Sequence, residues 1–223
     1  GGFKIRKSYI SIAILISNII LLLITSCNYK RIFDSKYYCE KLNFNCIRKN
    51  QNVFFKTSKG DFIVELYGVN SPVTVTNFIE NIKRGIYENK KFYKIISYPQ
   101  VQVIHSGVYS ENNYHKEENE NLNKPNPNIP LEIKLKTEIE PKYGYQILDP
   151  FEIVNLKNIF DKGSLAMMRS GKNNSSSTEF FFVTDKFPEL DGRYSIFGKV
   201  TEGIEVLEKI NKDDFIYEIT ISN

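Results

Sequence analysis

The segment 163–200 constrains the fold more than any other part of the chain. An apolar run that ends at Met168 is followed by a loop rich in Gly, Asn and Ser, and then by a second apolar run over 179–184. An Asp-Gly turn leads into a third run, over 194–200. Short apolar runs bounded by turn residues are typical of buried strands, so we expect strands at 179–184 and 194–200.

Other segments also show clear periodicity. A helix is predicted from Ser71-Pro72, which supply a cap and a first-turn proline, to Gly85, because apolar residues between them recur at helical spacing. Short helices near 150–159 and 204–210 and a closing strand over 215–221 are expected further along the chain. A β-hairpin is predicted around a turn at 58–61 from the alternating residues Val53, Phe55, Phe62, Val64 and Leu66.

The N-terminal region predicts export. A basic start is followed by an apolar stretch over 9–24, which is shorter than the roughly 20 residues that cross a bilayer. The stretch ends in Ile24-Thr25-Ser26-Cys27, which resembles a bacterial lipoprotein box. We therefore expect a signal peptide over 1–26, lipidation of Cys27, and a membrane-anchored lipoprotein of the bacterial cell envelope. The alternative is an uncleaved signal anchor with an incidental cysteine.

The residues after the lipidation site are polar and show no period, so 27–52 is interpreted as a lipidated tether. Cys39 and Cys46 lie within it, and the oxidising compartment outside the cytoplasm would allow this pair to persist as a disulfide. Neither His105 nor His115 lies near the pair in sequence, so no metal site is expected. The net charge of +4 is spread among acidic residues, which argues against a nucleic-acid partner.

Two long stretches and one short one resemble a known family. Residues 163–200 are similar to the central signature of bacterial cyclophilins, which are peptidyl-prolyl cis-trans isomerases, and 71–96 to the first helix and following strand of that family. The short stretch 129–133, IPLEI, matches a further family segment. The resemblance implies a mainly β fold, an eight-stranded antiparallel barrel with two capping helices, over 53–223 with an inserted loop region at about 109–162. It also implies a monomer that acts on proline-containing polypeptides.

The implied chemistry requires no cofactor. Rotation about an X-Pro bond meets a barrier of about 18–20 kcal/mol that arises from amide resonance. No bond breaks, so the enzyme only has to bind the twisted amide better than the planar one. The prolyl nitrogen becomes pyramidal and basic in the twisted state, so a cationic donor aimed at it stabilises that state.

The resemblance assigns roles to individual residues. Lys94 occupies the position of the family's catalytic arginine, and it keeps the charge but not the rigid fork of donors. Tyr93 stands where the family usually has histidine. Val103 aligns with a substrate-binding methionine, and His105 with a glutamine whose hydrogen-bonding role an imidazole can keep.

Further substrate-binding positions lie later in the chain. Phe181 matches the floor of the proline pocket, and Glu179 replaces a glutamine, so that an ion pair could hold Lys94 in place or draw it away from substrate. Glu189 stands where drug-sensitive members have tryptophan, which implies weak cyclosporin binding. Four other residues align with positions around the substrate, namely Met168, Arg169, Leu190 and Tyr194.

Two functions are consistent with these residues. The first is an active isomerase, with reduced activity, that assists the folding of exported proteins. The second is a cyclophilin-like lipoprotein that has lost efficient catalysis and binds peptides or partner proteins. The barrel framework and Phe181 favour the first, whereas Lys94, Glu179 and Glu189 favour the second.

Overall fold

A computed structural model of the chain describes residues 15–19, 34–108, 127–171 and 177–222. Cys27 and nearly all of the predicted signal peptide lie outside these ranges, as does the stretch 109–126 of the inserted region. In the part of the chain that the structure describes, no helix is long and apolar enough to cross a membrane.

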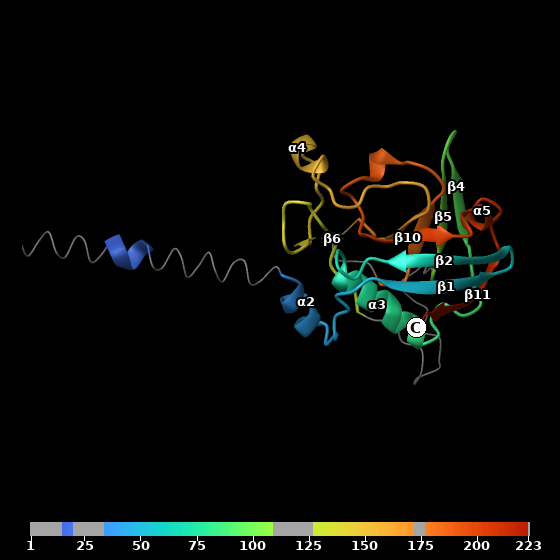
Figure 1. Cartoon of the computed structure of the whole chain (residues 1–223), viewed down its shortest axis with the longest axis horizontal. Helices are drawn as coiled ribbons and strands as arrows, with labels where there is room; N and C mark the ends of the chain where they lie inside the picture. The colour runs from blue at the N-terminus through green and yellow to red at the C-terminus, as the bar shows by residue number, and fades with distance from the viewer. Residues whose placement is uncertain (1–14, 20–33, 109–126, 172–176, 223) are drawn as a thin grey trace, which may run out of the picture.

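The domain is built on one curled antiparallel sheet, with strand order β3-β11-β1-β2-β10-β8-β9-β5-β4 (Figure 1). A separate pair, β6 (Glu132–Ile133) and β7 (Lys142–Tyr143), lies in the inserted region. The strands of the main sheet are β1 (Gln51–Thr57), β2 (Gly60–Leu66), β3 (Lys90–Lys91), β4 (Lys94–Ser97), β5 (Gln102–Ser106), β8 (Ser164–Met167), β9 (Phe180–Val183), β10 (Ile196–Glu202) and β11 (Phe215–Ile221).

The segment 90–97 closes this sheet into a barrel. Its first half, β3, pairs with β11, and its second half, β4, pairs with β5, so the two ends of the strand order meet in one stretch of chain. Only Phe92 and Tyr93 separate the two halves. When β3 and β4 are counted as one interrupted strand, the sheet has the eight antiparallel strands that the family resemblance implies.

The longest helix, α3 (Pro72–Lys83), confirms the helix predicted after Ser71, but its cap differs. Ser71 Oγ donates to the carbonyl of Ile196 at 3.1 Å, and the first turn of α3 is capped by the carboxylate of Glu132 instead. The other helices are short: α2 (Ser35–Lys41), α4 (Pro150–Ile153), the 3₁₀ turn η1 (Pro188–Leu190) and α5 (Ile204–Leu207). The second capping helix, predicted over 204–210, is thus the single turn α5.

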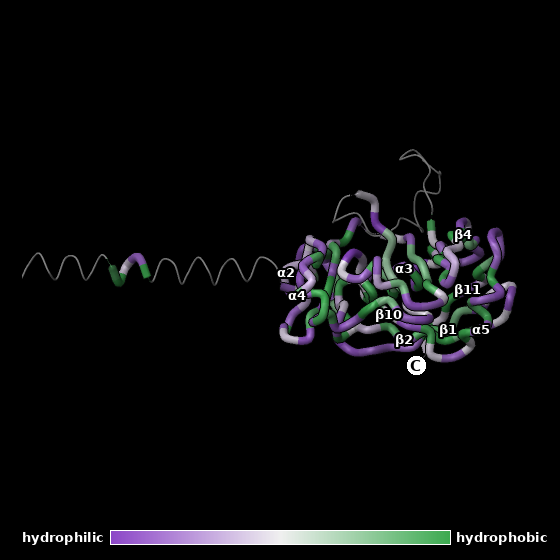
Figure 2. The backbone as a smooth tube through the Cα atoms, turned by 90° about the horizontal axis from the view of Figure 1, so that it is seen from above, coloured by the Kyte–Doolittle hydropathy of each residue, from purple (hydrophilic) through white to green (hydrophobic). Residues whose placement is uncertain are grey.

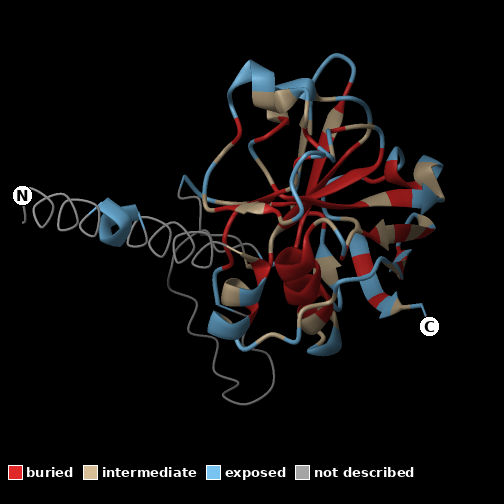
Figure 3. Cartoon of the chain, turned by 60° about the vertical axis from the view of Figure 1, so that its left-hand side comes forward, coloured by how far each residue is buried: buried red, intermediate tan, exposed pale blue. Residues whose placement is uncertain are grey.

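Aromatic side chains fill the barrel. Phe55 stacks on Phe62 at 4.8 Å, and Phe182 meets both rings edge-on. The helix α3 adds Phe78, which contacts the edge of Phe180 at 5.4 Å. Buried residues accordingly line α3 and the strands that it covers (Figure 3). This core fixes the strands, and the strands fix the positions of the candidate site.

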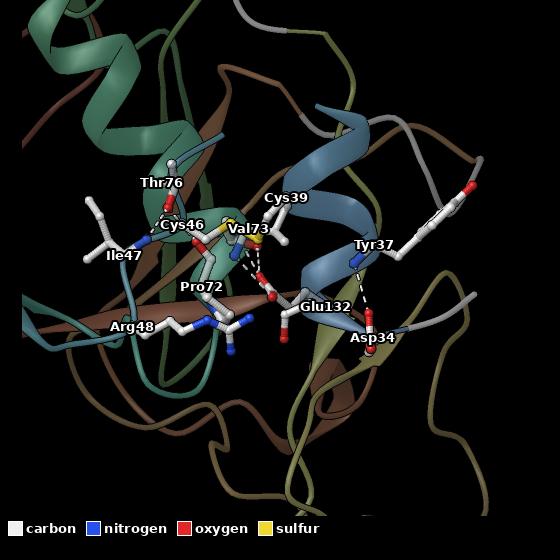
Figure 4. Close-up of a disulfide and its surroundings, with 12 residues drawn as sticks. Asp34, Tyr37, Cys39, Cys46, Ile47, Arg48, Pro72, Val73, Thr76 and Glu132 are labelled. Carbon is white, nitrogen blue, oxygen red and sulfur yellow. Dashed lines mark hydrogen bonds between the residues drawn. A yellow bond between two sulfur atoms is a disulfide. The ribbon is translucent and has the colours of Figure 1, made fainter. Parts of the chain in front are cut away.

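Residues 34–50 lie within the predicted tether, but they pack on the domain. Cys39 and Cys46 form a disulfide, and Cys39 is 7% exposed among apolar residues of α3 and the inserted region. The ring centre of Tyr38 lies 4.7 Å from that of Tyr143. Near the disulfide, Ile47 N–H donates to Thr76 Oγ1 at 2.8 Å (Figure 4). Polar composition concealed this packing, since it depends on a few apolar residues and one disulfide.

The inserted region also has its own small core. The strands β6 and β7 form a hairpin, and an isolated bridge joins Leu135 to Leu156. Together with α4 these segments form a lobe over 131–160, which we call the α4 lobe. Its buried apolar residues are Leu131, Ile133, Leu135, Ile147 and Leu156.

Candidate active site

Three neighbouring strands place the main site residues in one row. In the strand register, Lys94 of β4 lies opposite His105 of β5, and His105 lies opposite Phe181 of β9. Directly paired residues of an antiparallel sheet project from the same face, so these side chains lie beside one another. Lys94 is exposed, whereas His105 is 4% exposed and Phe181 is 1% exposed. The row therefore runs from a solvated cation to a buried aromatic ring.

Aromatic rings enclose Phe181. His105 and Phe160 stack on it at 5.6 and 5.7 Å, and Tyr194 meets it edge-on at 5.2 Å. Val103 belongs to the same apolar cluster, and Leu190 at the end of η1 packs against it. Phe181, which the sequence analysis predicts to form the floor of a proline pocket, is therefore covered by rings of the protein itself.

Tyr93 and Glu179 are joined by a hydrogen bond across the site. The hydroxyl of Tyr93 donates to Oε1 of Glu179 at 2.8 Å. Burial raises the pKa of Glu179, and the bond from Tyr93 partly offsets that rise. Among the described residues, Glu179 forms no ion pair with Lys94, so the carboxylate neither anchors the lysine nor withdraws it from the substrate.

His105 is held in its neutral form. Burial, followed by the nearby charge of Lys94, lowers its pKa to about 4. Its Nε2 atom is buried and has no hydrogen-bond partner in the described structure. A neutral imidazole with a free ring nitrogen can donate or accept one hydrogen bond, according to its tautomer. His105 therefore keeps the hydrogen-bonding capacity that the sequence comparison expects.

The rim of the site is held by Arg169. Its Nε donates to the carbonyl of Arg193 at 2.8 Å, and its guanidinium lies 5.2 Å from the ring centre of Tyr194. These contacts fix Tyr194 over Phe181. The neighbouring Met168 contributes its backbone N–H, which donates to the carbonyl of Glu179 at 2.9 Å.

Sequence reasoning missed two residues of the site. Phe160 was placed in the insertion without a role, yet it stacks on Phe181. The sequence indicates only a turn at Asp191, but its Oδ1 accepts from Phe160 N–H at 2.7 Å, and burial raises the pKa of its carboxyl. An isolated aromatic residue three positions before Gly163 was the only local signal. The contact with Asp191 joins segments that are distant in sequence.

The site contains no recognisable metal ligand set. Over the described ranges, no three residues among histidine, cysteine, aspartate and glutamate are grouped so that they could hold a metal ion. The described residues bring a cation, a neutral imidazole and a carboxylate together around an apolar cluster.

Known proteins resemble most of the chain. Residues 52–222 match a family model described as cyclophilin type peptidyl-prolyl cis-trans isomerase/CLD. Peptidyl-prolyl cis-trans isomerase-like 1 of Aspergillus niger is 33% identical over 167 residues, which cover 71% of this chain and 80% of that protein. A peptidyl-prolyl cis-trans isomerase of Helicobacter pylori is 26% identical over 184 residues, which cover 79% of this chain and 90% of that one.

Solved structures share the fold. A cyclophilin type peptidyl-prolyl cis-trans isomerase of Cryptosporidium parvum superposes with a TM-score of 0.53 at 22% identity, covering 78% of this chain and 99% of that one. A cyclophilin of Hirschia baltica superposes with a TM-score of 0.54 at 17% identity, covering 84% of this chain and 80% of that one. At these identities the comparison concerns the fold alone.

Proposed function

The chain belongs to the family of cyclophilin-type peptidyl-prolyl cis-trans isomerases, and we propose that it isomerises X-Pro bonds with Lys94 as its catalytic donor, at a reduced rate. The observation that carries this proposal is the row formed by Lys94, His105 and Phe181. A prolyl ring placed against Phe181 brings the amide to His105 and Lys94, the order that the reaction needs.

Each member of the row has a task in the proposed reaction. Lys94 donates to the prolyl nitrogen as it becomes pyramidal, and so stabilises the twisted amide over the planar one. His105, neutral at pH 7, holds a backbone group of the substrate through its free Nε2. Lysine is a point charge on a flexible stem, so less of its interaction is preorganised than that of an arginine. We expect the rate to be reduced for this reason.

Access to the pocket requires a side-chain movement. Because Phe181 is 1% exposed, a prolyl ring reaches it only when Tyr194 moves away. The stacking of Arg169 on Tyr194 opposes that movement. The second candidate is a peptide-binding protein without efficient catalysis, which is favoured by Lys94, Glu179 and Glu189 at positions where the family has other residues.

An isomerisation assay on short X-Pro peptides decides between the two. Lys94→Ala should lower kcat/KM by about 30-fold, which corresponds to about 2 kcal/mol, and Lys94→Arg should preserve or raise it. Lys56→Ala, which removes an exposed lysine of β1, should change nothing. The activity should be largely insensitive to cyclosporin, because Glu189 replaces the family's tryptophan.

One pair of results would contradict the isomerase proposal. If the wild type only matches the uncatalysed rate, and Lys94→Arg combined with Glu179→Gln restores none of the activity, the peptide-binding function is the better one.

We also propose that the protein is a lipoprotein of the bacterial cell envelope, anchored through Cys27. The lipobox-like residues 24–27 support this, and so does the Cys39–Cys46 disulfide, because disulfides persist mainly in oxidising compartments. Its substrates would then be proline-containing segments of exported polypeptides.

A further inference from the structure

The α4 lobe displays large apolar side chains to solvent. Ile139 is 93% exposed, Phe151 84% and Val154 70%, and Leu148 is half exposed beside them. Scattered exposed apolar residues are normal on a soluble protein, but a group of them on one lobe marks an interaction surface. We call Leu148, Phe151 and Val154, around the helix α4, the apolar tip.

The lobe holds these residues outward on a braced backbone. Lys134 Nζ donates to the carbonyls of Glu138 and Ile139, and Lys136 Nζ donates to the carbonyl of Val154. Beneath the tip, Leu135 and Leu156 belong to the lobe's own core. The exposed tip is therefore not part of the lobe's buried core, and the backbone at Val154 is held by a hydrogen bond.

The apolar tip lies at the same end of the domain as α2, the first described helix after the predicted anchor in sequence. Glu140 of the lobe contacts Ser35 and Arg48, and Lys142 forms an ion pair with Glu152 of α4 at 2.6 Å. These contacts connect α2 to α4 through the hairpin. Figure 1 and Figure 2 both show α2 and α4 at one end of the domain and β4 at the other.

The distance from the anchor to α2 is short. Eight peptide units separate Cys27 from Ser35, and even a fully extended chain of that length spans only about 28 Å. An acyl chain on Cys27 therefore keeps this end of the domain close to the bilayer. This step rests on the lipoprotein anchoring proposed above.

We propose that the apolar tip inserts into the interfacial layer of the lipid bilayer as a second contact beside the lipid anchor. The anchor raises the effective concentration of the apolar tip at the bilayer, so even a weak contact of the tip is populated. The bilayer then also fixes the orientation of the domain. The strand β4 with Lys94 faces away from the membrane, toward soluble substrates.

Tryptophan fluorescence tests the insertion directly, because the chain contains no tryptophan. Phe151→Trp places a single indole on the apolar tip, and Tyr217→Trp places one on β11, where the replaced side chain is 47% exposed. Each full-length protein is purified with its anchor and reconstituted into phosphatidylethanolamine–phosphatidylglycerol vesicles, with or without bromine on the acyl chains. Mass spectrometry reports acylation of Cys27 in the same samples.

Insertion predicts a clear difference between the two positions. With Cys27 acylated, the indole at 151 should shift to shorter wavelength and lose intensity to brominated lipid, while the indole at 217 stays unquenched. Both variants should keep the wild-type isomerisation rate, because neither residue lies in the active site.

The remaining outcomes overturn the inference and identify what has failed. An acylated protein whose indole at 151 is not quenched refutes insertion alone. An indole at 151 that is shielded from aqueous iodide but not quenched by brominated lipid points to a protein partner, and also refutes insertion. An unmodified Cys27 refutes the anchoring proposal, and the inference with it.

Discussion

Two partly or fully buried carboxylates show how differently this domain uses one chemical group. Glu132 is 1% exposed and accepts hydrogen bonds from Val73 N–H, from the N–H and Oγ1 of Thr74, and from the hydroxyl of Tyr143. Glu179 is half-buried and accepts from Tyr93 within the described structure. Burial raises the pKa of both carboxyls.

The two carboxylates differ in how many hydrogen bonds they accept. Glu132 joins the first turn of α3 to the inserted hairpin, and both of its oxygens accept hydrogen bonds. Glu179 keeps acceptor capacity on the side of the candidate site. A saturated group holds a fold together, whereas an unsaturated one can be approached by a ligand.

Truncation of each carboxylate tests this comparison with the largest expected effect. Glu132→Ala leaves two buried backbone N–H groups without their acceptor and removes one acceptor from the Tyr143 hydroxyl, and should cost about 3–5 kcal/mol of unfolding free energy. Glu179→Ala loses one bond at a half-exposed site and should cost less than about 1 kcal/mol. Urea denaturation of the two variants gives both values, and equal losses would show that the carboxylates have the same role.

The pH dependence of the unfolding free energy tests the candidate site through its buried histidine, His105. The pKa of His105 is about 4 in the folded protein and about 6.5 when unfolded, so the stabilisation tied to its neutral form is complete above pH 6.5 and is lost as the pH falls toward 4. The loss, relative to His105→Gln, should reach about 3 kcal/mol. Glu179 and Asp191 titrate in both proteins, so the difference between the two unfolding curves isolates the histidine.

A parallel pair of curves would contradict this prediction. It would mean that the imidazole of His105 is solvated well enough to titrate normally in the folded domain.

Removal of the disulfide tests the region around Glu132, where α3 meets the inserted hairpin, and should have a smaller effect on stability. Replacement of Cys39 and Cys46 by serine should lower the unfolding free energy by about 2 kcal/mol, because the clipped loop is short. The kcat/KM for peptides should stay unchanged, since the disulfide contacts residues of α3 and the inserted region and none of the site row. A change in kcat/KM at constant stability would show that the two regions are coupled.

Local patterns predicted most of the barrel. The hairpin at 58–61, the helix after Ser71 and the closing strand 215–221 follow from the period of apolar residues, and the structure confirms each. The register of the family motifs also placed Lys94, His105 and Phe181 in one site, and the strands bring them side by side. Their roles in catalysis stay predictions.

Contacts between distant segments could not be read in the same way. The cap of α3 comes from Glu132, about sixty positions away, and Phe160 is positioned by Asp191. The packing of residues 34–50 depends on Tyr38 and Cys39 reaching Tyr143 and Val73, and no periodicity records such pairings. The enclosure of Phe181 likewise depends on three rings from three parts of the chain.

The segment 90–97, which closes the barrel, limits when this domain can finish folding. Its β3 half pairs with β11, so Lys91 can pair only after Phe215 is available, a residue more than a hundred positions later in the chain. A chain that is synthesised from its N-terminus leaves strand edges unpaired until β11 is available, and unpaired edges favour aggregation. We expect closure of the barrel to be a late step of folding. The candidate site, whose Lys94 lies on the β4 half of this segment, would then be complete only after the last strand of the chain has paired.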